Sequence, residues 1–206
     1  MNKRVIALFT LVVVTISAHS QALSQSRCSL TEANSPSVRG LRLGMTTQEL
    51  QALFPGSAAR WAKEPKKARE AREKAMAPTS SEPVSLAFDP ATDAAKDQFA
   101  SVDSVSVALY KGRVTDFSVI YVGTEWNNID QWVAKVSETL SLPGPREWVV
   151  GPSETPNKVL KCSGVEIEAA TQGGGSSIRI RNTEYLKGLD DRANTLDEKK
   201  RRDFKP

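Results

Sequence analysis

Residues 38–56 have the sequence VRGLRLGMTTQELQALFPG, and the fold prediction starts from this stretch. The pattern is typical of a short strand, a glycine turn, a capped helix and an abrupt stop. Thr46 is placed at the N-cap and Glu49 three residues later, which is the reciprocal arrangement of a capping box. Met45 and Leu50 can form the hydrophobic staple that sets the entry angle of the helix. The closing proline–glycine pair predicts that the helix stops there.

The first 22 residues match the pattern of a secretory signal peptide. Two basic residues precede an apolar run from Val5 to Ile16, and small and polar residues follow it. We expect cleavage after Ala22, with cleavage after Ser20 as the alternative. The run is shorter than the roughly 20 residues that span a bilayer, which disfavours an uncleaved anchor. The pattern therefore predicts an exported protein, periplasmic or extracellular, with no membrane span after signal cleavage.

Cleavage of the signal peptide after Ala22 removes Lys3 and Arg4 and leaves 184 of the 206 residues. The formal net charge then falls from +4 to +2, and the two signs are interleaved along the chain. A nucleic-acid-binding protein would show a basic patch or stripe instead. The composition predicts a mixed-charge surface and no nucleic-acid partner, and the length predicts one domain.

The two cysteines, Cys28 and Cys162, can form one disulfide in an exported chain. This bridge would close a long loop and stabilise the fold by about 4–5 kcal/mol in the chain-entropy model. It would also hold residues 23–37, an extended leader rich in Ser, Gln and Asn, on the sheet. Two unpaired thiols are the alternative. Lipidation at Cys28 is disfavoured because Arg27 directly precedes it.

Residues 57–83 predict a charged helical insertion. Pro65 can occupy the first position of a helix over residues 66–77, which are strong helix formers, and Pro78 ends it. The apolar side of this helix consists of three alanines and Met76, which is too small to bury deeply. We expect a surface helix with a solvated basic run; a partner-binding face is the alternative.

Alternating apolar residues predict strands after the insertion. Residues 84–88 form one candidate, and residues 104–109 and 114–122 form a hairpin around Lys111-Gly112. One face of the second hairpin strand carries Phe117, Val119 and Tyr121, and the other carries Ser118, Ile120 and Val122.

The loop between the first strand and the hairpin contains Asp89, Asp93 and Asp97. A calcium loop needs closely spaced acidic ligands and a distal bidentate glutamate, and neither is present. The spacing therefore predicts a plain acidic loop rather than a cation site.

The second half begins with Asn128, which can cap a helix whose apolar stripe runs from Ile129 to Leu140. This stripe predicts that the helix packs on the sheet. Residues 187–206 are highly charged, and we expect a disordered tail or an isolated helix there. Further strands are predicted at 148–150, 159–162, 165–169 and 178–180.

The two helix stops resemble each other: LFPG at 53–56 and LSLPG at 140–144 each precede a tryptophan and candidate strands. This similarity suggests that residues 38–186 consist of two similar halves, each with a helix followed by strands. We predict an α+β domain, an antiparallel sheet with helices packed on one face.

Few residues have the chemistry of a catalytic or metal site. The only histidine, His19, lies in the expected signal peptide, which excludes histidine-dependent catalysis and metal binding after cleavage. The triple glycine at 173–175 precedes a strand rather than a helix, so it predicts a turn and not a phosphate site. Glu166 and Glu168 alternate with apolar residues and are expected on a polar sheet face. We predict no catalytic residue, no metal and no cofactor; a carboxylate-dependent hydrolase is the less favoured alternative.

The four tryptophans are Trp61, Trp126, Trp132 and Trp148. Burial in the core is the expected role of such large aromatic side chains. An anchor for a protein partner is the alternative for Trp61 or Trp126.

Residues Leu43 to Leu50, with Leu53 nearby, resemble the GMT-x-x-E-V-x-x-L opening of small exported bacterial envelope proteins. That group has the β-lactamase-inhibitor-protein-like fold and includes the small lipoprotein of the outer-membrane barrel-assembly machine; the chain is also similar to uncharacterised exported proteins. The resemblance implies helices on an antiparallel sheet and a binding role. The chain departs from the group in its length, its charged insertion and its lack of a lipidation cysteine. No partner and no functional residue is therefore carried over.

The leading hypothesis is an exported, non-catalytic binding or envelope-assembly module. Its exposed sheet face or its helical insertion would contact another protein. The alternative is an inhibitor that blocks an extracellular hydrolase with a loop from the sheet. No binding residue is assigned by the sequence.

Overall fold

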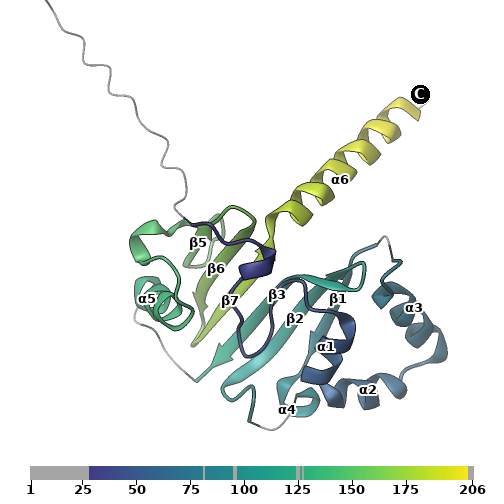
Figure 1. The fold of residues 1–206 in the computed structure, drawn as a ribbon, viewed down its shortest axis with the longest axis horizontal. Coiled ribbons are helices and arrows are strands. Elements are labelled where there is room, and N and C mark those ends of the chain that lie inside the picture. Colours follow the sequence, from purple (N-terminus) through teal and green to yellow (C-terminus); the bar gives the residue numbers. More distant parts are fainter. Residues whose placement is uncertain (1–27, 81, 95–96, 124–125, 127, 204–206) are drawn as a thin grey trace, which may run out of the picture.

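The computed structural model describes residues 28–203 except 81, 95–96, 124–125 and 127 (Figure 1). The expected signal peptide, residues 1–22, lies outside the described residues. Seven strands form one antiparallel sheet in the order β1-β2-β3-β7-β6-β5-β4. They are β1 (Val84–Phe88), β2 (Val102–Tyr110), β3 (Arg113–Val122), β4 (Val149–Val150), β5 (Asn157–Lys161), β6 (Val165–Gln172) and β7 (Gly175–Asn182).

The described helices confirm the predicted α+β class. They are α1 (Thr47–Leu53), α2 (Pro55–Ala62), α3 (Lys66–Met76), α4 (Pro90–Asp93), α5 (Ile129–Thr139) and α6 (Thr183–Asp203), with short 3-10 turns at Glu32–Asn34 and Pro145–Glu147. Among these helices, none combines the length and the apolar composition needed to cross a membrane.

The capping box predicted at the start of α1 is present. The Glu49 amide donates to Thr46 Oγ1 (3.2 Å), and the Thr46 amide donates to a Glu49 carboxylate oxygen (2.7 Å). The segment before the helix is hydrogen-bonded to the β2–β3 hairpin, because the Val114 amide donates to the Met45 carbonyl (2.9 Å). This attachment places the fully buried Leu50 over the sheet.

The sequence predicts no helix between the Pro55-Gly56 stop and residue 66, but α2 is present there. The pair ends α1, but proline at a first helical position equally favours a new helix, and α2 begins at Pro55. Gly56 is required because an added Cβ would clash with the carbonyl oxygen of Thr92 in α4. Trp61 therefore lies in α2, and Pro65 is the N-cap of α3 rather than its first residue.

The helix predicted after Asn128 is confirmed as α5. Asn128 Oδ1 accepts from the Gln131 amide (3.0 Å), and the apolar stripe packs on β5 and β6. Helices α1, α2 and α4 cover the β1–β3 part of the same sheet face (Figure 1). The shared core includes Leu50, Phe54, Val105, Val107, Phe117, Val119, Trp132, Val133, Ile167, Ile178 and Ile180.

The chain has two similar halves at the level of topology. The first consists of helices followed by the meander β1-β2-β3, and the second of α5 followed by the meander β5-β6-β7 with the short β4 at its edge. The halves join where β3 pairs with β7, with Val119 opposite Ile178. The inserted α2 and α3 distinguish the first half from the second.

The predicted disulfide is present between Cys28 and Cys162, which are 134 residues apart in sequence. Backbone hydrogen bonds extend the attachment, because Ser163 and Gly164 donate to the carbonyls of Cys28 and Leu30 (3.2 and 2.9 Å). The bridge and these bonds hold the described part of the leader against the β5–β6 turn.

The expectation of a disordered tail is not met, since α6 continues to Asp203. Asn182 caps its start by accepting from the Tyr185 amide (3.1 Å), and basic residues in the last turn favour the helix end. Every described side chain from Asp190 onward is exposed. Arg192 still lies over the Tyr110 ring of β2, 4.8 Å from its centre, and beyond this contact the helix extends away from the sheet (Figure 1). The tail is thus a helix, as in the second of the two forms expected for it.

Removal of the disulfide should strongly destabilise the protein. We expect the double variant Cys28→Ser/Cys162→Ser to lose about 4–5 kcal/mol of unfolding free energy, because the bridge restricts a very long loop in the unfolded chain. Urea denaturation followed by circular dichroism measures this loss. The reduced wild-type protein serves as the control and should match the double variant. An unchanged urea midpoint would contradict the stabilising role.

Candidate functional site

One face of the sheet carries no described helix except the first turns of α6, and we call it the open face. There Tyr185 packs on Tyr110 of β2 with ring centres 5.2 Å apart, and Arg192 lies 4.8 Å from the centre of the same ring. The open face contains the side chains that alternate with the core residues of each strand. Ser106, Ile120 and Arg179 are exposed there although they lie on β2, β3 and β7, none of which is an edge strand. The β1–β3 part of this face consists mainly of small side chains: Ser85, Ala87, Ser104, Ser106, Ala108 and Ser118.

The β7–β6 part of the open face is charged. Five side chains, which we call the charge ladder, connect β3, β7 and β6: Asp116, Arg179, Arg181, Glu166 and Glu168. Arg179 donates through Nε to both carboxylate oxygens of Asp116 (2.9 and 3.1 Å), and this hydrogen bonding raises the pKa of the guanidinium. Arg181 lies between the two glutamates, with its Nε 3.3 Å from Glu166 Oε1.

The position of Glu166 and Glu168 agrees with the prediction of a polar sheet face. Their side chains are only 20% exposed, because Arg181 lies against both of them. Asn157 also donates to Glu168 (2.8 Å). These partners account for both carboxylates as members of an ion-pair network, and the pair does not flank an open cleft as in a glycosidase.

Two aspartates of the acidic loop have partners within the protein. Asp89 caps α4 by accepting from the Ala91 amide (3.0 Å), and Asp93 turns inward to Arg60. No cluster of His, Cys, Asp or Glu among the described residues could hold a metal ion. The prediction of a plain loop missed only the short helix α4.

Asp93 is the most buried carboxylate described. Arg60 donates to it through Nε (3.0 Å) and Nη2, and the Asp89 amide adds a third hydrogen bond (3.0 Å). Burial alone raises the pKa of Asp93, but the hydrogen bonds outweigh burial and the pKa lies below its ordinary value. The Arg60–Asp93 pair connects α2 to α4. It accounts for the charged residue Asp93 in the acidic loop.

Three of the four tryptophans are core residues, as predicted. Trp61 packs on Phe88 with ring centres 5.7 Å apart, Trp132 donates to the Ser177 carbonyl (2.9 Å), and Trp148 donates to Ser137 Oγ (3.1 Å). Trp126 is half-buried and lies 5.3 Å from Trp132. Its indole nitrogen is buried without a hydrogen-bond partner among the described residues.

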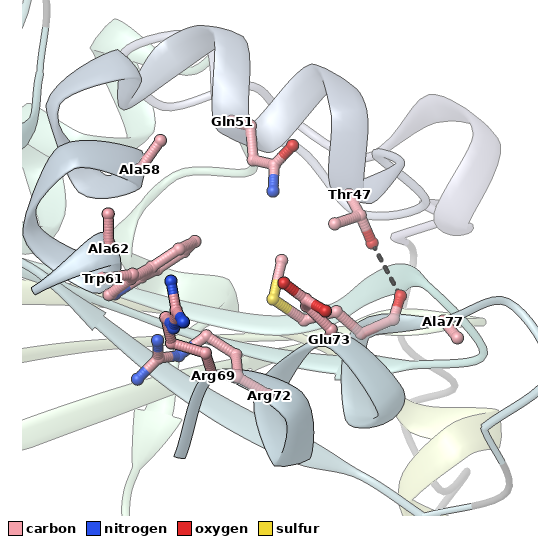
Figure 2. A pocket seen from close by; sticks show the side chains of 10 residues that line it. Thr47, Gln51, Ala58, Trp61, Ala62, Arg69, Arg72, Glu73 and Ala77 are labelled. Carbon is pink, nitrogen blue, oxygen red and sulfur yellow. Dashed lines mark hydrogen bonds between the residues drawn. The ribbon is translucent and has the colours of Figure 1, made fainter. Parts of the chain in front are cut away.

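A groove of about 390 Å³ separates the charged helix α3 from α1 and α2 (Figure 2). Arg72 extends from α3 over the Trp61 ring, 4.8 Å from its centre, and forms an ion pair with Glu64. Thr47 Oγ1 donates to the Met76 carbonyl (3.1 Å) and closes one end, as the dashed line in Figure 2 shows. The principal polar contacts around the groove thus connect α1, α2 and α3. Their main effect is to hold the helical insertion in place.

Sequence reasoning found neither this groove nor the charge ladder. Both depend on the relative placement of elements that are distant in sequence, and no local motif marks them. Comparison of the chain with protein-family models, with curated proteins and with solved structures finds no match. The geometry of the described residues alone therefore indicates the candidate site, and this site is mainly the open face.

Disruption of the Arg60–Asp93 pair should destabilise the protein. We expect Asp93→Asn to lower the unfolding free energy by about 2 kcal/mol at pH 7, less than for a fully buried pair, since the Arg60 side chain is 42% exposed. The contribution of Asp93 is fully present above its unfolded-state pKa of about 3.9 and is lost as the pH falls through its lower folded-state pKa. The stability difference between the two proteins should therefore shrink in acid.

Urea denaturation at pH 7 and at pH 3 measures this difference. The matched control is Asp190→Asn, the same substitution at an exposed position on α6, which should change stability by less than about 0.5 kcal/mol. Equal stability of the two variants at pH 7 would contradict the role of the pair.

Proposed function

We propose that this protein is an exported, non-catalytic binding module whose open face contacts another protein. The observation that carries the proposal is the exposure of Ser106, Ile120 and Arg179 on interior strands of a large sheet. A sheet whose only task is structural can leave one face to water, but such a face is usually a plain polar surface. This one also carries the exposed apolar side chains of Ile120 and Val122 beside Arg179, and arginine is enriched in protein interfaces.

The arrangement on β3 and β7 indicates what the partner presents. Arg179 lies opposite Ser118, and its side chain is 45% exposed despite its bond to Asp116. Next along β3 come Ile120 and Val122, which are 42% and 45% exposed. A partner segment with an acidic side chain beside an apolar one fits this surface. The small serines and alanines of β1 and β2 allow such a segment to approach the sheet closely.

Four further observations support the proposal. The disulfide is consistent with an oxidising compartment, which agrees with export through the N-terminal leader. The acidic members of the charge ladder are already occupied by arginines, which favours binding over acid–base catalysis. The resemblance of residues 38–56 to small envelope proteins supports a partner in the bacterial envelope. The mixed charge of the open face disfavours a nucleic acid as partner.

A large charged side chain on the open face should block the partner. We expect Ser106→Arg to weaken binding by about tenfold or more, because it fills the space over the small residues. The matched control is Ser153→Arg, the same change at an exposed position in the loop between β4 and β5. The thermal unfolding of both variants should match that of the wild type.

Photocrosslinking measures the effect in cells. A benzophenone amino acid at position 106 should give a discrete adduct, and Arg179→Glu should remove it. The same amino acid at position 153 should give none. The adduct partner, once purified, should bind the wild type and the Ser153→Arg variant alike in titrations. Equal binding to the Ser106→Arg variant, or identical adducts from both positions, would contradict the proposal.

A further inference from the structure

A second pocket lies on the helix side of the sheet, away from the open face. It has a volume of about 490 Å³, within the range of small-molecule sites. Its walls come from the segment before α1, the end of β3, the start of β7 and the inner face of α5. The apolar and aromatic lining consists of Val38, Tyr121, Trp132, Val136, Leu140 and Ile178.

Aromatic rings form one wall of the pocket. The ring of Trp132 meets Tyr121 edge-on with centres 5.6 Å apart, and its other neighbour, Trp126, is 5.3 Å away. The hydrogen bond from Trp132 Nε1 to the Ser177 carbonyl fixes the orientation of this ring. A flat aromatic ligand can pack against such a preformed wall in offset or edge-to-face geometry.

Two hydrogen-bond donors in this pocket lack partners among the residues that the structure describes. They are the hydroxyl of Ser176, a residue that is only 3% exposed, and the indole nitrogen of Trp126. Buried polar groups in folded proteins are nearly always hydrogen-bonded, and an unpartnered one calls for an explanation. Both atoms are closed to solvent, so an acceptor in the pocket reaches them only after a side-chain movement.

The charge of the pocket favours an anion. Arg39 and Lys135 line it, and among the residues that the structure describes no acidic side chain does. The Arg39 guanidinium is positioned by its hydrogen bond to the Ala100 carbonyl (3.2 Å). Lys135 is paired with Glu138 (3.0 Å), but both side chains are more than half exposed, so this pair is weak and can open. Burial raises the pKa of Tyr121 more than Arg39 lowers it, so the phenol stays neutral.

We propose that this pocket binds a small aromatic carboxylate. The ring lies against Tyr121, Trp126 and Trp132, and the carboxylate faces Arg39. The carboxylate supplies the negative charge that the two cations of the lining favour. The pocket and the open face lie on opposite sides of the sheet, so this inference is independent of the proposed protein partner.

Naphthalene-2-carboxylate and its neutral carboxamide are suitable probes. Titration of the 15N-labelled, disulfide-intact protein should shift the indole signals of Trp126 and Trp132, identified by the variants Trp126→Phe and Trp132→Phe. The signals of Trp61 and Trp148 should stay in place, because these rings lie outside the pocket. Shifts of all four signals, or of none at saturating probe, would overturn the proposal.

The charge assignment has its own test. Arg39→Gln should weaken carboxylate binding by about five- to tenfold, since it removes a charge-assisted contact, and should leave carboxamide binding unchanged. The matched control Arg146→Gln, at an exposed position outside the pocket, should change neither affinity by more than about twofold. Equal loss for both probes, or no loss for the carboxylate, would overturn the assignment. Ser106→Arg should not alter probe binding. The result for the pocket is therefore distinguishable from the result for the proposed protein-binding role of the open face.

Discussion

The pairing of β3 with β7 is the interaction on which the rest of the structure depends. These two strands come from different halves of the chain, and their antiparallel register places Phe117 opposite Ile180 and Val119 opposite Ile178. All four side chains are buried in the common core, so a shift of one residue would turn them towards water. Without this pairing, each half would expose a sheet edge and half of its apolar face. The ion pair between Asp116 and Arg179 strengthens the same junction from the opposite side.

The junction also explains the placement of the two candidate surfaces. Helices α1, α2, α4 and α5 lie on the same side of the sheet, so the core and the aromatic pocket form there (Figure 1). The other side is open except where the first turns of α6 meet Tyr110. The disulfide at Cys28 and the Arg60–Asp93 pair fasten peripheral segments to this framework. The framework therefore separates a surface suited to a protein from a pocket suited to a small anion. One chain can present both without overlap.

The sequence predicts the elements whose determinants are local. The capping box of Thr46 and Glu49 and the apolar stripe of α5 each lie within a dozen residues, and both are present. The disulfide was predictable because two cysteines allow one pairing. The start of α2 at Pro55 is not predicted, because a proline that ends one helix can also begin the next. Three other features connect residues that are distant in sequence or on separate elements. They are the Arg181–Glu166 contact, the Arg60–Asp93 pair and the Trp126–Trp132 wall. Their partners are set by tertiary packing, which no local pattern in a single sequence records.

Native-state hydrogen exchange tests most directly whether the two halves form one cooperative unit. The account predicts that the most protected amides of β3 and β7 exchange with the same free energy, and that this value equals the global unfolding free energy from denaturation. Amides of the exposed part of α6 should exchange much faster. Exchange of β1–β3 at a clearly different free energy from β5–β7 would show that the halves unfold separately and would contradict the account.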